Sequence, residues 1–95
     1  MTLNKTFSAL SDPTRRTILD LLKQKSLPVG DIALHFTITL PTLSHHLNVL
    51  KQANLVTTER QGQQIIYSLN LSVFEEIAKD LYVFFNKTKP PKRHG

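Results

Sequence analysis

The sequence predicts a mainly α-helical domain that carries a single two-stranded β-hairpin. Three observations support this fold class: apolar residues recur at helical spacing, short turns separate these segments, and Val, Ile, Thr and Tyr gather on both sides of Gly62. The 95 residues suit one domain, and 40% of them are hydrophobic, as in ordinary globular proteins. A domain of this size buries a modest fraction of its surface, so pairing with a second copy would add burial.

Two helices are predicted in the first quarter of the chain. Leu3, Phe7 and Leu10 recur at i, i+4 and i+7, which indicates a short first helix. Asp12 suits the cap of a second helix over residues 13–25, whose first position is a proline. The apolar face of this second helix consists of Ile18, Leu19 and Leu22.

Two further helices follow, joined by a short turn. Apolar residues within 29–36 predict about two helical turns, and residues 37–39 form the turn. A fourth helix begins at Pro41 and should end near Asn54, because Asn tolerates the left-handed conformation that ends helices. Its inward side is formed by Leu43, Leu47 and Leu50. Two helices connected in this way make a helix-turn-helix.

A hairpin and a last helix complete the chain. Residues 55–60 and 64–69 have strand composition and enclose Gly62. Ser72 and Glu75 have the spacing of a capping box, and the helix that they begin should run to about Asn86. A helix-turn-helix followed directly by a hairpin is the winged-helix layout. We expect this domain over residues 1–86, followed by a basic, disordered tail over residues 87–95.

The charge distribution bears on the partner. The net charge of +5 favours an anionic partner such as nucleic acid. However, the last nine residues hold four of the twelve basic side chains, so the rest of the chain is nearly neutral. Composition alone therefore does not predict DNA binding, and the case for it depends on the sequence motifs.

Several classes of protein are disfavoured. The absence of cysteine excludes disulfides, thiolate metal sites and cysteine nucleophiles. No phosphate-binding Gly-rich loop, His-Glu-x-x-His or Gly-x-Ser-x-Gly motif is present, so we do not expect an enzyme. The N-terminus has no secretory signal, and the longest apolar run, residues 81–85, is too short to span a bilayer. We expect a cytoplasmic protein without membrane insertion.

Three segments resemble the ArsR-type repressors, a family of winged helix-turn-helix proteins. Residues 11–19, SDPTRRTIL, resemble the opening segment of that family, and residues 43–53, LSHHLNVLKQA, resemble its recognition helix. Residues 60–63, RQGQ, followed by 67–69, YSL, resemble its wing. Within the family, the chain is most similar to the small metal-free autorepressors of the SdpR type. The resemblance implies a homodimer, formed by the first and last helices, on an inverted-repeat operator in its own promoter.

The resemblance also bears on metal sensing, because many family members release DNA when metal binds. One family site uses a Cys-Val-Cys-Asp motif, where this chain has Pro-Val-Gly-Asp at residues 28–31. Another site uses Asp and His on the last helix, where this chain has Glu75, Glu76 and Asp80 and no His. We therefore expect no metal and no other cofactor.

The predicted partner is double-stranded DNA. A recognition helix presents its N-terminal residues to base edges, and no acidic residue lies between Ile32 and Thr58 that would repel phosphates. The alternative is a surface helix that is neutral by chance. The candidate DNA-binding residues are Thr39, Thr42, Ser44, His45, Lys51, Arg60, Gln61 and Gln63.

Several of these candidates also have a structural interpretation. Thr39 could simply cap the helix, and Arg60 could be a solvated side chain rather than a contact with phosphate or the minor groove. His46 is expected to be a packed, hydrogen-bonded histidine. For Arg15 and Arg16 we favour a structural role over contact with the DNA backbone.

The last helix has an apolar face wider than one core requires. A purely intramolecular core is the alternative to a dimer interface. The candidate interface residues are Leu3, Phe7, Leu10, Phe74, Ile77, Leu81, Phe84 and Phe85.

Two other functions remain open. A metal- or ligand-responsive derepressor could use the imidazoles of His35, His45, His46 and His94, although neighbouring histidines on a helix point about 100° apart. A winged helix used for protein contacts is the second alternative. A protein anti-repressor that controls a DNA-binding repressor is also compatible with the sequence.

Overall fold

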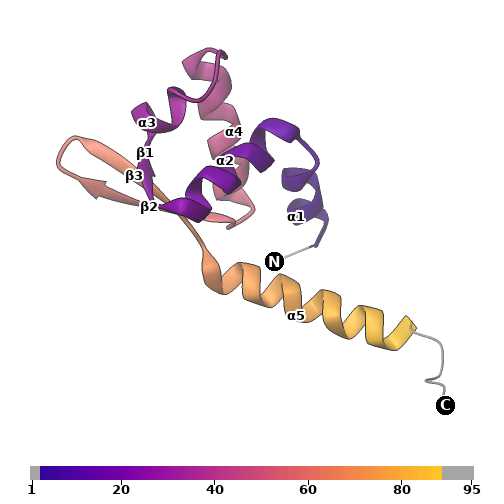
Figure 1. Cartoon of the computed structure of the whole chain (residues 1–95). Helices are drawn as coiled ribbons and strands as arrows, with labels where there is room; N and C mark the ends of the chain where they lie inside the picture. Colours follow the sequence, from indigo (N-terminus) through magenta and orange to yellow (C-terminus); the bar gives the residue numbers. More distant parts are fainter. Residues whose placement is uncertain (1–2, 89–95) are drawn as a thin grey trace.

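The computed structural model describes residues 3–88, which form helices arranged around a small sheet (Figure 1). The prediction of a mainly helical domain with a β-wing is confirmed. The elements in chain order are α1 (Leu3–Leu10), α2 (Pro13–Gln24), β1 (Leu27–Pro28), α3 (Val29–Ala33), α4 (Leu40–Gln52), β2 (Val56–Gln61), β3 (Gln64–Leu69) and α5 (Leu71–Thr88).

The core lies where α2, α3 and α4 meet the base of the sheet. Leu43, Leu47 and Leu50 of α4 are all buried, as their spacing predicted. A fully buried leucine contributes about 1.5–3 kcal/mol relative to an exposed one, so these three residues fix which side of α4 faces the interior. The other buried apolar residues are Ala9, Ile18, Leu19, Leu22, Leu27, Ile32, Ala53, Leu55, Val56 and Ile77.

Local signals define the ends of the two long helices in the body. Asp12 caps α2 by accepting the backbone N–H of Arg15 at 3.1 Å, and Pro13 occupies the first turn. Thr39 caps α4 in the same way, accepting the backbone N–H of Thr42 at 3.3 Å. Beyond the end of α4, Asn54 adopts a positive φ of 61°. These boundaries agree with the prediction.

The sheet has three antiparallel strands in the order β1-β3-β2. We call the hairpin of β2 and β3 the wing; it turns at Gly62, whose φ of 64° suits a residue without Cβ. The third strand, β1, was not predicted from the sequence. Leu27 and Pro28 pair with Tyr67 and Ile66, partners too distant in sequence for any local pattern to reveal.

The start of the last helix also differs from the prediction. α5 begins at Leu71, where Asn70 serves as the cap by accepting the backbone N–H of Val73 on Oδ1 at 3.4 Å. The capping box at Ser72 is therefore wrong. The backbone N–H of Asn70 donates to the carbonyl of Leu55 at 3.0 Å, so the end of the sheet fixes where the helix starts.

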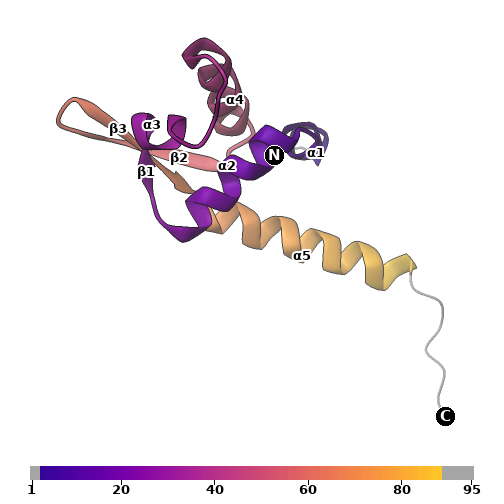
Figure 2. The same cartoon turned by 45° about the horizontal axis from the view of Figure 1, so that its top comes forward.

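α5 extends well beyond the rest of the domain (Figure 2). It ends at Thr88, slightly past the predicted end at Asn86. The predicted disordered tail over residues 87–95 is wrong at its start, because Lys87 and Thr88 belong to α5, and its remainder, residues 89–95, lies outside the described residues. α3 is also shorter than expected, one turn rather than two. No helix in the part of the chain that the structure describes is both long and apolar enough to cross a membrane.

Candidate nucleic-acid interface

One side of α4 faces solvent, opposite its three buried leucines. Ser44 and His45 are both exposed on this side, as predicted. Asn48 is also exposed and stands one turn further along, four residues after Ser44 and three after His45, so the three side chains share one face. We call Ser44, His45 and Asn48 the α4 polar face. It presents hydroxyl, imidazole and carboxamide groups, which can donate and accept hydrogen bonds at base edges.

Asn48 was not among the sequence candidates. Its signal was available, because it follows Ser44 and His45 at i+4 and i+3 and avoids the leucine side of the helix. The carboxamide of asparagine can form a bidentate pair with adenine in the major groove. Asn48 therefore belongs with the candidates on chemical grounds as well as by position.

Thr39 and Thr42 lie at the N-terminal end of α4, and both are exposed. Their side chains contact each other, because the Thr39 hydroxyl donates to Oγ1 of Thr42 at 3.0 Å. Thr39 also accepts from the backbone of Thr42, so the capping role considered for it is present. The pair holds the first turn of α4 at an exposed helix end, where the positive end of the helix dipole favours anions.

The charges near the α4 polar face favour an anionic partner. Lys51 is exposed near the C-terminal end of α4. The nearest acidic residues in sequence are Asp31 and Glu59, which lie outside the helix and its preceding turn. A helix without carboxylates does not repel phosphate groups.

The tip of the wing offers a second polar surface. Arg60, Gln61 and Gln63 are all exposed, and Gly62 lies at the turn between them. Nε of Arg60 donates to the carbonyl of Gly62 at 3.3 Å, which holds the guanidinium close to the tip. Since guanidinium has five N–H donors, the others can still reach a phosphate.

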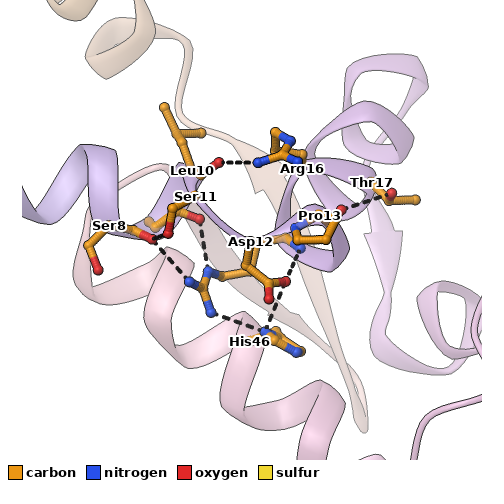
Figure 3. Close-up of polar contacts among 10 residues, drawn as sticks. Ser8, Leu10, Ser11, Asp12, Pro13, Arg16, Thr17 and His46 are labelled. Carbon is orange, nitrogen blue, oxygen red and sulfur yellow. Dashed lines mark hydrogen bonds and ion pairs between the residues drawn. The ribbon is translucent and has the colours of Figure 1, made fainter.

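His46 is packed and hydrogen-bonded, as the sequence predicted (Figure 3). Its Nδ1 lies 3.2 Å from Nη1 of Arg15 and 3.8 Å from Oδ2 of Asp12. The same Oδ2 accepts the backbone N–H of Arg15, and this hydrogen bond is the main cause that lowers the pKa of the Asp12 carboxyl. α4 is thus joined to the start of α2 through one imidazole.

Arg15 and Arg16 have the structural role that the sequence favoured. Arg15 donates from Nε to the carbonyl of Ala9 at 2.8 Å and from Nη2 to that of Ser8 at 3.0 Å. Arg16 donates to the carbonyl of Leu10 at 2.8 Å. These carbonyls lie at the C-terminal end of α1, where the helix supplies no partner; the two arginines bond all three, and Ser11 also donates to the carbonyl of Ser8.

The histidines do not converge. His35 is exposed beyond α3, whereas His45 and His46 are neighbours on α4 with ring centroids 5.7 Å apart. His94 lies outside the described residues. Within residues 3–88, no three His, Cys, Asp or Glu side chains lie close enough together to hold a metal ion.

The candidate interface residues on the first and last helices differ in their exposure. Phe7 of α1 and both Phe84 and Phe85 of α5 are exposed, by 50%, 57% and 63%. Ile77 is only 6% exposed and belongs to the core of its own chain, so little of it could reach a second subunit. The half-buried candidates, which also pack against that core, are Leu10, Phe74 and Leu81. The side chain of Leu3 lies outside those described.

A groove lies beside the apolar side of α5. It measures about 500 Å³ and runs between α2, the end of β3 and the start of α5. Leu71 and Phe74 line the groove and also belong to α5, so the groove and the apolar side of α5 are continuous.

Comparison with known proteins identifies the relatives of this fold. The model of the arsR family of bacterial regulatory proteins matches residues 12–58. The chain is 52% identical to the transcriptional repressor SdpR of Bacillus subtilis (strain 168) over 85 residues, which are 90% of this chain and 94% of that protein. These relatives are regulators rather than enzymes.

Solved structures show the same architecture. An ArsR-like transcriptional regulator from Rhodococcus sp. RHA1 has a TM-score of 0.83 and 27% identity, covering 90% of this chain and 80% of that one. The homodimeric winged helix-turn-helix DNA-binding domain of a possible ArsR-family regulator from Mycobacterium bovis has a TM-score of 0.71 and 28% identity, covering 97% and 87%. The extent and identity of the SdpR match, together with these structures, show that this chain belongs to the ArsR family of bacterial regulatory proteins.

Proposed function

We propose that this chain is a transcriptional repressor that binds an inverted-repeat operator as a homodimer. This operator would lie in the promoter of its own gene. The observation that carries the proposal is the α4 polar face, held outward by the buried leucines on a helix without carboxylates. Repression would be steric, because a dimer bound over a promoter occludes polymerase. Acting on the bacterial chromosome, it would work in the cytoplasm.

Each contact surface has a distinct part in this proposal. Ser44, His45 and Asn48 of the α4 polar face would reach base edges in the major groove and supply sequence specificity. The N-terminal turn of α4, with Thr39 and Thr42, would lie against the DNA backbone and contribute affinity through the helix dipole and the two threonine hydroxyls. The contacts with phosphate or the minor groove would come from Lys51, Arg60, Gln61 and Gln63.

The dimer is supported by the apolar side of α5. Phe74, Ile77, Leu81 and Phe84 recur at helical spacing along one side, and α5 continues past the body that covers its first half. Phe84 and Phe85 are consequently exposed. The centroids of their rings lie 5.6 Å apart, so the two side chains form one aromatic surface. A large exposed aromatic surface on a small domain favours a protein interface, and a second copy would provide one.

Two-fold pairing sets the geometry of the operator. Two symmetric recognition helices contact half-sites about 34 Å apart, which is one turn of DNA. The operator would then be an inverted repeat. One domain of this size buries limited DNA surface, so the dimer also doubles the contacts that make binding specific.

We propose further that metal does not control this repressor. The chain has no cysteine, so it cannot form the thiolate sites used by metal-sensing members that its sequence resembles. The last helix carries Glu75, Glu76 and Asp80, which are exposed and have no histidine beside them on that helix. Isolated exposed carboxylates bind transition metals weakly.

A binding titration tests the proposal. The whole chain is titrated onto a labelled duplex from its own promoter, and onto a scrambled duplex, at several salt concentrations with zinc or chelator present. We expect preference for the promoter duplex by about 10³-fold or more, a steep salt dependence, and no effect of zinc. Equal binding to both duplexes would contradict an operator, and release by micromolar zinc would favour a metal-responsive derepressor.

A further inference from the structure

His46 occupies the junction between α4 and the start of α2. Its Nδ1 lies 3.2 Å from Nη1 of Arg15 and 3.8 Å from Oδ2 of Asp12, so one nitrogen faces a cation and an anion (Figure 3). The ring is half-buried, whereas the adjacent ring of His45 is exposed on the α4 polar face. The side chain that joins α4 to the body is therefore the immediate neighbour of a candidate DNA contact.

The protonation state of His46 decides which neighbour it bonds. A guanidinium group only donates hydrogen bonds, so Nδ1 must supply a lone pair to Arg15. This requires the neutral imidazole with its proton on Nε2. When His46 is protonated, Nδ1 becomes a donor: the bond to Arg15 is lost, two cations face each other, and the Asp12 carboxylate becomes the favourable partner.

Hydrogen bonds to other groups hold both Arg15 and Asp12 in place, so neither can move with the His46 ring. Arg15 is held by the carbonyls of Ala9 and Ser8 at 2.8 and 3.0 Å. Asp12 is held by the backbone N–H of Arg15 at 3.1 Å. When the imidazole is protonated, the groups that must move are therefore the His46 side chain and α4, the helix that carries it.

We propose that His46 is a positioning residue of α4 and makes DNA binding sensitive to pH. The neutral ring, bonded to Arg15, holds α4 in its binding orientation; the protonated ring turns to Asp12 and α4 moves with it. This inference rests on the proposed function. Among the described residues, the charged and titratable groups placed against the ring are Asp12 and Arg15 from the start of α2 and His45 from α4 itself.

The sign of this effect opposes that of an ordinary surface histidine. Histidine changes charge between about pH 5 and 8, and a protonated imidazole at the DNA surface attracts phosphate. Acid should therefore strengthen any contact made by His45. Protonation of His46 should weaken binding, because it removes a bond that orients the helix. A comparison of two histidine variants separates these contributions.

The test uses His46→Asn and, as the matched control, His45→Asn in the full chain. The asparagine Oδ1 replaces Nδ1 as an acceptor for Arg15 but does not titrate. Affinity for the operator duplex is measured at pH 7.5 and 5.5 at constant salt. We expect His46→Asn to bind like wild type at pH 7.5 and about five- to tenfold more tightly than wild type at pH 5.5. The His45→Asn control should keep the loss of affinity in acid.

Other outcomes overturn the proposal. If His46→Asn changes with pH as wild type does, or binds much more weakly at pH 7.5 while folded, His46 does not act in this way. Should that variant fail to fold, imidazole ¹⁵N spectra of the wild-type chain decide: the Nε2–H tautomer at neutral pH is expected, and the Nδ1–H tautomer contradicts it. Wild type that binds no operator at pH 7.5 would instead contradict the proposed function.

Discussion

Oδ2 of Asp12 accepts the backbone N–H of Arg15 at 3.1 Å, and this hydrogen bond is the main reason that the pKa of the Asp12 carboxyl lies below its ordinary value of 3.8. A carboxylate with a lowered pKa stabilises the folded state above the unfolded pKa, and this contribution disappears as pH falls through the folded pKa. The cap of α2 should therefore weaken only in strong acid.

Asp12→Asn tests this link between the cap and acid stability. Asparagine can still cap the helix but does not titrate, so we expect a slightly lower melting temperature at pH 7 and a less steep loss of stability below about pH 4 than in wild type. Thermal unfolding followed by circular dichroism measures both. Asp20→Asn, at an exposed ion pair with Lys23, is the control and should keep the wild-type acid profile. An Asp12→Asn profile parallel to wild type would contradict the assignment.

Alanine substitutions on the α4 polar face should weaken operator binding without unfolding the chain. His45→Ala and Asn48→Ala should each cost about 1–3 kcal/mol in binding to the operator and much less in binding to random DNA, because base-edge contacts supply discrimination. Fluorescence anisotropy gives both affinities. Gln24→Ala, at the exposed end of α2, is the control. Wild-type affinity in either variant would remove that residue from the interface.

Arg60→Ala tests the wing in a different way. A phosphate contact carries no sequence information, so the variant should bind operator and random DNA more weakly by similar factors. The slope of log affinity against log salt should decrease in magnitude by about one. Lys25→Ala removes another exposed positive charge, beyond α2, and should leave the slope unchanged. An unaltered slope for Arg60→Ala would mean that the side chain only stabilises the turn at Gly62.

Phe85→Asp tests the proposed dimer. Phe85 is 63% exposed in the single chain, so a carboxylate there is compatible with folding but would be buried in a dimer interface. We expect a monomer by light scattering and a loss of operator affinity of about 10²-fold or more, because a monomer makes only half of the contacts. Asn86→Asp adds the same charge one residue along and should remain dimeric. A dimer formed by Phe85→Asp would place the interface elsewhere.

The helices were predictable because their signals are local. The leucine spacing of α4, its threonine cap and the Asn54 ending all operate within one or two turns, and the structure has each of them. The exposure of Ser44 and His45 follows directly, since burial of one side of a helix assigns the other to solvent.

The errors arose where distant residues decide local structure. β1 exists because Leu27 and Pro28 pair with β3, about 40 residues along the chain, and two residues carry no strand pattern of their own. α5 begins at Asn70 rather than Ser72 because the Asn70 N–H is bonded to the Leu55 carbonyl at the edge of the sheet. Both residues are good caps, and only tertiary structure chooses between them.

The candidate site was predictable in its chemistry but not in its full extent. Asn48 was missed because a recognition helix is expected to contact bases with its N-terminal residues, and Asn48 lies one turn further along α4. The contact between His46 and Arg15 joins residues on separate helices, so no spacing rule could locate it, although the packed character of His46 followed from its place beside Leu47.

Selection of bound duplexes from random DNA by the wild-type chain is the most direct measurement of the central claim, that two copies of α4 present the same polar face to one duplex. The account predicts enrichment of an inverted repeat whose half-sites are centred about 10 base pairs apart, with altered preference within the half-site for Asn48→Ala. Enrichment of a single half-site, of a direct repeat, or of no sequence at all would contradict it.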